Sequence, residues 1–465
     1  MNDAVKRIKH IAPKTFELLY LGCLFLMTFE IAVPLPISLF KGFYIAAFVV
    51  LLLRVTLLRE GFSLLLPTAL RNGRILLPLF LLLGYLVWDA VGLLYSPDVE
   101  YAARKYYVVL PMLLFLVPTL CYARDELHLN RLYLTLGWSG AAVLLFSVAN
   151  YFIYELVALP YIRRLSTIAD YNRYAENLFV ALALMGYGIL GTNRRSRRRL
   201  LLLFSVLVLF AAAITVSGSR RTYLLMFPAV TLLLLFRAFY IARYSDTERT
   251  AFARLCFGCG LCALGAAAVF LLQAGFERYS DVKYEQLVED GGVVSEENSV
   301  DAVIDSISGG GMFEKRAVIW KVAADTALDY DFQDILVGRG SGYDSYLYDH
   351  TSDKALATLY QSVEPKPKNW MNPHNFVLAD YLNGGLVRIL LSLGLCASIF
   401  ASLWAVFTRR PGRALGPLTV AAFVYFGAFI SGRYGFVNDK FFYIVLACIV
   451  TEHALAMRAR PATGR

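Results

Sequence analysis

A histidine followed by an asparagine marks the segment "NWMNPHNFVLADYLNGG" (Asn369–Gly385) as a place where chemistry could occur. Of the five His residues, only His374 stands where a polar segment turns into a long apolar one at the predicted outer boundary of a membrane. With an ordinary pKa of about 6.5, imidazole is the side chain best suited to accept a proton near neutral pH. The alternative is a structural role, because Asn, Pro and His also stop or cap helices. The pattern makes His374 a candidate general base.

Arg316 and Trp320 form a second feature, in "RAVIW". A spacing of four residues places both side chains on one face of a helix. A guanidinium group clamps phosphate through two parallel hydrogen bonds, and an indole ring stacks on a sugar or shields a site. An amphipathic helix with an interfacial Trp gives the same pattern without any ligand.

Cations recur near apolar segments elsewhere. "SGSRR" carries Arg220 and Arg221, and "SGRYGFVNDK" carries Arg433. Arg388 and Asp380 follow His374 within an apolar region, where ionisable residues are costly and turn towards the protein interior. These two residues either belong to a site or pair with each other.

One Gly-rich stretch and one Cys-rich stretch could suggest binding sites, but each has a structural explanation. "GRGSGY" (Gly338–Tyr343) matches neither a P-loop nor a dinucleotide fingerprint, so we expect a tight turn. "CFGCGLC" (Cys256–Cys262) lies in an apolar run without His or acids, and its cysteines are expected to be small packing residues. We predict no metal, no cofactor and no disulfide framework.

The composition places these residues in a membrane protein. The chain has 465 residues, of which 58% are hydrophobic and only 17% charged. Runs of about 20 apolar residues can each cross a bilayer, which excludes a soluble enzyme or a nucleic-acid-binding protein. We expect an all-α polytopic protein with about twelve transmembrane helices, at 16–33, 38–57, 75–95, 106–121, 132–157, 174–191, 200–216, 222–242, 252–275, 385–408, 414–431 and 439–457.

Loop charges predict the orientation of these spans. If the N-terminus is cytoplasmic, every even-numbered loop is rich in Arg, including "NRRSRRR" (Asn193–Arg199). Arg220, Arg221 and Arg433 then lie on the outer face against this bias, as do cations in "YIRRLSTIADYNRY". Cations held there suggest an anionic ligand, although acids or lipid headgroups could also pair with them.

One sizeable polar segment interrupts the spans. We predict transmembrane helices at 1–276 and 374–465 and an outward-facing loop domain at 277–373. The first half of the loop is acidic and Gly-rich and is expected to be mobile. Its second half is expected to hold a helix at "GMFEKRAVIWKVAADTALDY" and then a short apolar run into the Gly-rich turn.

Taken in order, "SGSRRTYLL", "RAVIW", "VGRGSGY" and "HNFVL" resemble the motifs of the O-antigen ligase and O-antigen polymerase superfamily of bacterial envelope glycosyltransferases. The resemblance covers roughly 215–395, and the N-terminal half agrees only in its layout of spans. It implies a GT-C-like membrane fold in the bacterial inner membrane, with a site that faces the periplasm. Two positions depart from the family pattern "E-x-G-x-x-G": the acid is replaced by Asn383, and the last glycine is replaced by Arg388.

The resemblance also implies a reaction. Its donor is a glycan linked through pyrophosphate to an undecaprenyl lipid, and its acceptor is the lipid A-core or another glycan. Arg220 and Arg316 would neutralise the leaving pyrophosphate without a metal, and His374 would accept the proton of the attacking hydroxyl. Arg221, Trp320, Asn375, Arg388 and Arg433 would complete the substrate-binding site. A single displacement predicts inversion at the anomeric carbon.

Several functions share this donor. We favour a ligase that transfers the glycan to lipid A-core. The alternatives are a polymerase, whose acceptor is a second lipid-linked glycan, and a protein O-oligosaccharyltransferase. A transporter is less favoured because the sequence shows no repeated halves and its polar residues gather on one face.

Overall fold

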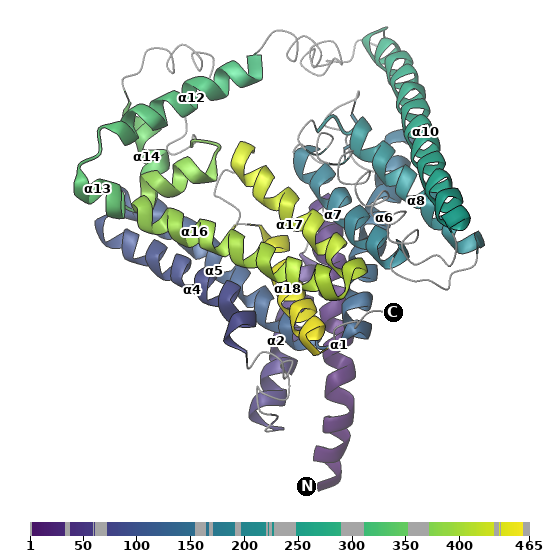
Figure 1. The fold of residues 1–465 in the computed structure, drawn as a ribbon, viewed down its shortest axis with the longest axis horizontal. Coiled ribbons are helices and arrows are strands. Elements are labelled where there is room, and N and C mark those ends of the chain that lie inside the picture. The colour runs from purple at the N-terminus through teal and green to yellow at the C-terminus, as the bar shows by residue number, and fades with distance from the viewer. Residues whose placement is uncertain are drawn as a thin grey trace. The chain divides into compact units, whose positions relative to one another are not determined.

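The computed structural model describes residues 2–32, 38–58, 60, 72–153, 164–166, 171–190, 197–219, 222, 226, 248–289, 311–351, 372–431, 437 and 439–458. All regular structure within these ranges is helical, and no strand occurs in them (Figure 1). The all-α class is therefore confirmed for this part of the chain.

Seven helical segments of the described residues are long and apolar enough to cross a membrane: Ile8–Glu30, Leu39–Thr56, Gly73–Tyr95, Val99–Tyr122, Glu126–Ile153, Phe376–Arg409 and Lys440–Arg458. Each overlaps a predicted span, and two shorter apolar helices, Phe204–Val216 and Gly416–Phe429, overlap two more. The predicted span 222–242 lies almost entirely outside the described residues. The chain is thus an α-helical membrane protein, whereas the count of twelve spans stays a prediction.

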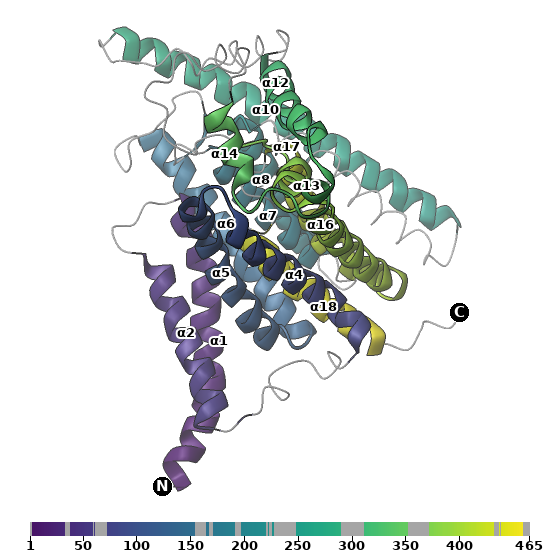
Figure 2. The ribbon, with the colours of Figure 1, turned by 90° about the vertical axis from the view of Figure 1, so that its left-hand side faces the viewer.

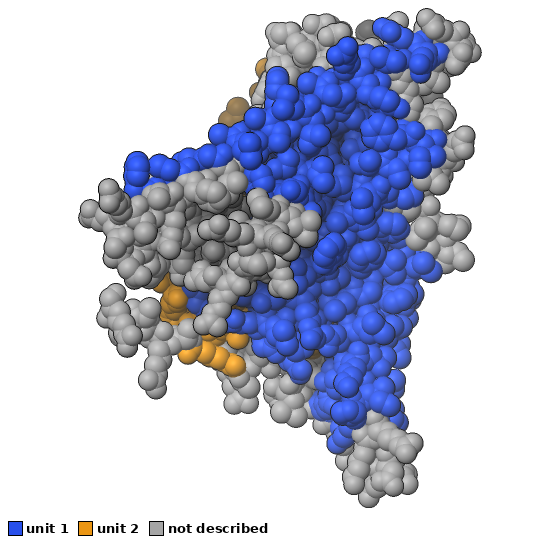
Figure 3. All heavy atoms as spheres, turned by 90° about the vertical axis from the view of Figure 1, so that its right-hand side faces the viewer, with its two compact units in different colours: residues 1–65, 122–303, 410–420 blue, residues 66–121, 304–409, 421–465 orange. Residues whose placement is uncertain are grey.

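The helices group into two compact units, coloured separately in Figure 3. Unit 1 consists of residues 1–65, 122–303 and 410–420. Its helices are α1 (Asn2–Ala32), α2 (Leu39–Thr56), α6 (Glu126–Ile153), α7 (Tyr171–Leu190), α8 (Arg197–Val216), α10 (Glu248–Glu289) and the start of α17 (Pro411–Ser431). Small residues let α6 and α7 approach closely, since a Cβ atom at Gly137 would lie 2.8 Å from that of Met185.

Unit 2 consists of residues 66–121, 304–409 and 421–465 and contains most of the motifs. Its helices are α4 (Gly73–Val91), the short 3-10 helix η2 (Gly92–Tyr95), α5 (Val99–Tyr122), α12 (Gly311–Leu328), α13 (Phe332–Val337), α14 (Tyr343–His350), α16 (Phe376–Arg409), α18 (Lys440–Arg458) and the rest of α17. Helix α16 is central, because it contacts α4, α18, α12 and the two short helices α13 and α14 (Figure 2).

Helix α10 corrects one expectation. The segment after residue 276 was expected to be a mobile loop, but α10 continues to Glu289. No Pro or Gly occurs between Phe276 and Glu289, and a side-chain hydrogen bond of 2.9 Å joins Gln273 to Glu277 one turn later. The boundaries at 277 and 373 mark the segment that is predicted to lie outside the membrane on its outer face, and they stay a prediction. Helix α12 and the Gly-rich turn after α13 are confirmed.

Candidate functional site

His374 lies immediately before the capped start of α16. The side chain of Asn375 caps the helix, with its Oδ1 accepting from the backbone N–H groups of Val377 at 3.0 Å and Leu378 at 3.3 Å. Asn372 Oδ1 accepts from the backbone N–H of His374 at 2.9 Å. His374 has a φ of 49°, the one positive value among the described residues other than glycine. Such a conformation costs about 1–3 kcal/mol, so the surrounding bonds hold the backbone of His374 in a strained conformation.

The helix that carries Arg316 is tied to this segment. The indole N–H of Trp320 donates to the carbonyl oxygen of Pro373, the residue before His374, at 2.8 Å. The ring of Trp320 lies 6.4 Å from that of Phe429, which lies 6.5 Å from that of Phe376. Arg316 is half-buried one turn before Trp320 on α12. The structure therefore brings the "RAVIW" helix against the "HN" segment, although 53 residues separate Trp320 from Pro373.

Helix α16 is interrupted at Gly385, whose φ of 60° and ψ of −156° are not helical. Just before this break, three carbonyl oxygens accept hydrogen bonds from outside the helix. Leu382 O accepts from the backbone N–H of Arg339 and from the hydroxyl of Tyr330, both at 3.0 Å. Asn383 O accepts from the backbone N–H of Gly340 at 3.0 Å. Gly384 O accepts from the indole N–H of Trp88 at 3.0 Å. Backbone groups that a broken helix leaves unpaired are costly when buried, so these donors stabilise the break.

The turn "GRGSGY" is shaped to fit this break. Gly338, Gly340 and Gly342 all have positive φ values, between 71° and 92°. A Cβ atom at Gly338 would overlap the backbone of Gly384, and one at Gly385 would lie 2.5 Å from the carbonyl of Leu336. Only glycine permits both this conformation and this approach. The tight-turn interpretation is therefore the one that the geometry supports.

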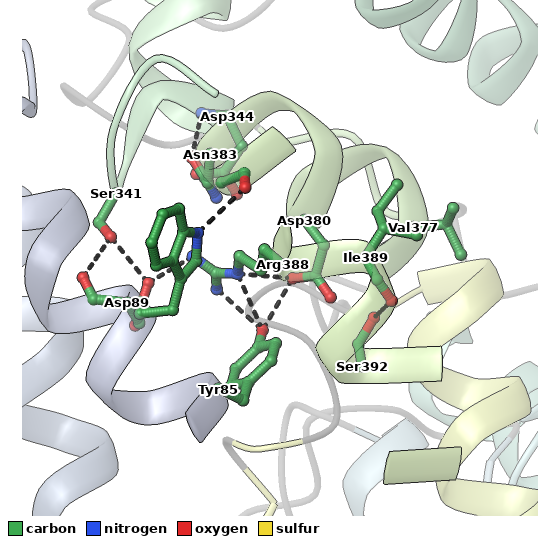
Figure 4. Close-up of polar contacts among 12 residues, drawn as sticks. Tyr85, Asp89, Ser341, Asp344, Val377, Asp380, Asn383, Arg388, Ile389 and Ser392 are labelled. Atoms are coloured by element: carbon green, nitrogen blue, oxygen red, sulfur yellow. Dashed lines mark hydrogen bonds and ion pairs between the residues drawn. The ribbon is translucent and has the colours of Figure 1, made fainter. Parts of the chain in front are cut away.

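Arg388 lies three residues after the break, in a network drawn in Figure 4. It is only 4% exposed. Its Nε donates to Asp380 Oδ1 at 3.0 Å, its Nη2 donates to the hydroxyl of Tyr85 at 2.8 Å, and its Nη1 forms an ion pair with Asp89. The hydroxyl of Tyr85 donates in turn to Asp380 Oδ1 at 2.7 Å. This network joins α4 to α16.

These contacts support pairing of Arg388 within the protein, and its role in substrate binding stays a prediction. A buried charge must be neutralised by a partner, and here two carboxylates already neutralise the guanidinium group. The interpretation in which Arg388 and Asp380 pair is confirmed. Sequence reasoning missed Asp89, yet a signal existed, because Asp89 is the single charged residue of the predicted span 75–95.

The network reaches the glycine turn through Ser341. Its hydroxyl lies 2.7 Å from both the carbonyl oxygen and the Oδ1 of Asp89, and its backbone N–H donates to Gly92 O at 3.0 Å. A second link is the backbone N–H of Asp344, which donates to Asn383 Oδ1 at 2.9 Å. Asp344 also forms a buried ion pair with Lys105 at 3.2 Å. The turn is thus held to both α4 and α16.

A further set of polar contacts holds α13 to the turn. Arg339 donates to Asp334 Oδ2 at 2.7 Å and to the hydroxyl of Tyr343 at 2.8 Å, and its guanidinium carbon lies 4.6 Å from the ring centroid of Tyr330. Burial, with Tyr343 nearby, raises the pKa of Tyr330 above its ordinary value. Its hydroxyl therefore stays protonated at neutral pH and donates to Leu382 O.

Unit 1 holds the start of the "SGSRR" motif. Gly218 has a φ of 74°, and Ser219 Oγ donates to Asn172 Oδ1 at 2.8 Å. Arg164 lies against this turn, where a Cβ atom at Gly218 would be 3.1 Å from its Nε. Its guanidinium carbon is 4.2 Å from the ring centroid of Tyr171. The chain therefore turns just after the end of α8, with the cation of Arg164 beside the turn.

The remaining predicted residues cannot be placed. Arg220, Arg221 and Arg433 lie outside the described residues. Of the predicted set, the structure joins Trp320 to the segment that carries His374 and Asn375, and Arg316 lies one turn before Trp320 on the same helix. Arg388 lies in a separate buried network. Comparison of the chain with protein-family models gives no match, and comparison with curated proteins gives none either.

Proposed function

We propose that this protein is a membrane glycosyltransferase of the O-antigen ligase type, which moves a glycan from undecaprenyl pyrophosphate to lipid A-core at the outer face of the bacterial inner membrane. The observation that carries the proposal is the hydrogen bond from Trp320 to Pro373. It joins the helix that carries a candidate phosphate-binding cation, Arg316, to the segment that carries a candidate base, His374. Both motifs occur in the order that the resemblance requires.

In the proposed reaction, His374 accepts the proton of an acceptor hydroxyl whose oxygen attacks the anomeric carbon of the donor. The bond between this carbon and the pyrophosphate oxygen breaks, and the configuration inverts. Arg316 neutralises the charge that develops on the leaving pyrophosphate. Arg220 keeps the same role by resemblance. Trp320 and Asn375 hold the segment in place, through the Pro373 carbonyl and the helix cap.

The test is a lipopolysaccharide gel from a deletion strain complemented with the wild type, His374→Asn or His374→Ala. Asn tolerates the positive φ of this position, so His374→Asn removes the base while it retains the backbone. We expect both variants to be made and inserted but to restore less than about one hundredth of the product. Full complementation by His374→Asn would contradict the proposal.

The same gel identifies the acceptor. If deletion removes both the ladder and the band of core plus one unit, attachment has failed and the protein is a ligase. If the band of core plus one unit survives without the ladder, extension has failed and the protein is a polymerase. An unchanged lipopolysaccharide with altered glycoproteins would identify a protein oligosaccharyltransferase.

A further inference from the structure

Helix α13 exposes large apolar side chains at its junction with α12. Leu328 is 83% exposed, Phe332 76% and Leu336 38%. We call these three residues the α13 apolar face. The segment lies in the stretch predicted to be a polar loop domain, where side chains of this size are expected to turn inward. Leu328 is the last residue of α12, and Phe332 and Leu336 lie on α13. Large exposed apolar side chains that lie close together indicate an interaction surface.

The α13 apolar face is distinct from the side of α13 that packs on the protein. Phe332 and Leu336 are four residues apart and therefore share a helix face. Ile335 packs into the core cluster formed by Tyr330 and Leu382. Asp334 lies nearly opposite the apolar face and pairs with Arg339. Helix α13 therefore has an inner side that the protein covers and a second apolar side that it leaves exposed.

The exposed surface of the neighbouring spans indicates what covers this face. Leu83, Val87, Val91 and Leu94 are all exposed and recur at helical spacing along α4 and η2. Leu386, Leu390 and Leu393 form a similar exposed series on α16. In helices that cross a membrane, such a stripe faces the acyl chains of the lipids.

The α13 apolar face begins where these stripes end. The hydroxyl of Tyr95, next to Leu94, donates to the carbonyl oxygen of Val337 at 2.8 Å. The carbonyl of Leu336 approaches Gly385, next to Leu386, so closely that a Cβ atom would lie 2.5 Å away. Figures 1 and 2 both show α13 beside the ends of α4 and α16. Helix α13 is therefore held against the two spans next to Leu94 and Leu386, which are members of their exposed apolar series.

We propose that α13 is an interfacial helix, whose apolar face enters the membrane at the boundary between headgroups and acyl chains. The occupant of this surface is membrane phospholipid. Asp329, Asp331 and Gln333 are exposed beside the apolar face and remain in water or among headgroups. Because these neighbours are acidic or neutral, the attraction is apolar rather than electrostatic, and it does not depend on salt.

The inference is independent of the proposed reaction and is tested without an activity assay. The photo-crosslinking residue benzoylphenylalanine replaces Phe332 or Leu328 in the full-length protein, and Gln333 serves as the matched control position. Each variant is reconstituted into liposomes of phosphatidylethanolamine and phosphatidylglycerol, irradiated, and analysed by intact-protein mass spectrometry. A thermal transition equal to that of the wild type confirms folding.

We expect phospholipid adducts at positions 328 and 332, little adduct at position 333, and no change in 0.5 M NaCl, a concentration high enough to screen headgroup charges. Equal adduct formation at position 333 would overturn the proposal, because lipid contact would then not be restricted to the α13 apolar face. Cross-links from positions 328 and 332 into protein alone would also overturn it and would indicate a protein partner instead.

Discussion

At the scale of single residues, Arg388 and Arg316 represent two different uses of a cation. Arg388 is buried and bound to two carboxylates and a tyrosine hydroxyl, so its charge serves the packing of α4 on α16. Arg316 is half-buried on the helix that Trp320 ties to the "HN" segment. We propose that the first arginine has a structural role and that the second is a ligand for phosphate.

This difference predicts opposite results for two substitutions. Arg388→Met leaves the carboxylates of Asp89 and Asp380 buried without a counter-charge, which costs about 3–5 kcal/mol of stability. We expect a large fall in the thermal transition temperature in detergent. Arg316→Met should leave that temperature within a few degrees of the wild type while product formation falls. Equal thermal stability of both variants would show that Arg388 is not structural.

The two acids of the network are also expected to differ. Asp89 pairs with Arg388 and also accepts from Ser341 in the glycine turn, whereas both bonds to Asp380 Oδ1 come from Arg388 and Tyr85 within the contact between α4 and α16. Asp89→Asn therefore weakens contacts to α16 and to the glycine turn, and we expect it to lower the thermal transition temperature more than Asp380→Asn does. A larger loss in Asp380→Asn would contradict this ranking.

At the scale of elements, the break in α16 is the feature on which the others depend. It turns carbonyl groups of one helix towards donors on α4, on the glycine turn and at Tyr330. The turn can approach only because Gly338 and Gly385 lack side chains. The docking of the glycine turn on α16 therefore depends on a backbone irregularity that two glycines permit.

Two glycines of the same helix provide a matched test of this statement. Gly385→Ala would place a methyl group 2.5 Å from the Leu336 carbonyl at a φ of 60°, and we expect a loss of about 2 kcal/mol or more. At Gly394 the nearest atom to an added Cβ is 3.7 Å away, in the side chain of Leu81. Gly394→Ala should therefore be neutral or stabilising by up to about 1 kcal/mol. Thermal unfolding of both variants is the measurement, and equal effects would refute the role of the break.

The loss of the bond from Tyr330 at alkaline pH is expected to weaken the docking of α13. Because burial raises its pKa in the folded protein, its contribution to stability is complete below the unfolded pKa of about 10 and is lost as pH rises further. Tyr330→Phe should cost about 1 kcal/mol at pH 7 through the lost bond to Leu382. We expect this difference from the wild type to shrink above pH 10. A difference that is constant with pH would contradict this assignment.

At the scale of the whole molecule, the chain is a set of membrane helices whose motifs belong to two compact units. The turn at Gly218 belongs to unit 1, and the "RAVIW" helix, the glycine turn and His374 belong to unit 2. The segment between α10 and α12 joins these parts of the chain and is predicted to face outward, because the basic loops are expected to be cytoplasmic.

This orientation is tested by fusions to alkaline phosphatase, which is active only outside the cytoplasm. Fusion after Glu289 should give high phosphatase activity, whereas fusion after Arg409 should give little, because the "RRPGR" loop is predicted to be cytoplasmic. A reporter that is active only in the cytoplasm should give the opposite pattern at both positions. High phosphatase activity after Arg409 alone would invert the predicted topology.

The sequence alone determined the fold class and the position of most elements. Long apolar runs can be stable only as helices in a membrane, and the overlap of predicted and observed spans reflects this constraint. Local patterns also predicted helix α12 and the turn after α13. Helical periodicity and closely spaced glycines determine the backbone conformation within a few residues, so they can be recognised in the sequence. A helix cap in this segment was the alternative to a catalytic role, and the structure shows that Asn375 forms one.

Only the tertiary structure decided which of these residues meet. Arg388 and Asp89 are 299 positions apart, and Trp320 and Pro373 are 53 positions apart. Whether a buried charge serves a ligand or a partner depends on which helix packs beside it, and periodicity within one helix does not contain that information. Helix α10 extends to Glu289, beyond the expected boundary. The acidic composition of the segment favours a loop, but the residues between Phe276 and Glu289 include no Pro or Gly that would break a helix. Arg388 contributes to helix packing because a buried charge pairs with an opposite charge nearby, and the fold determines which residue that is.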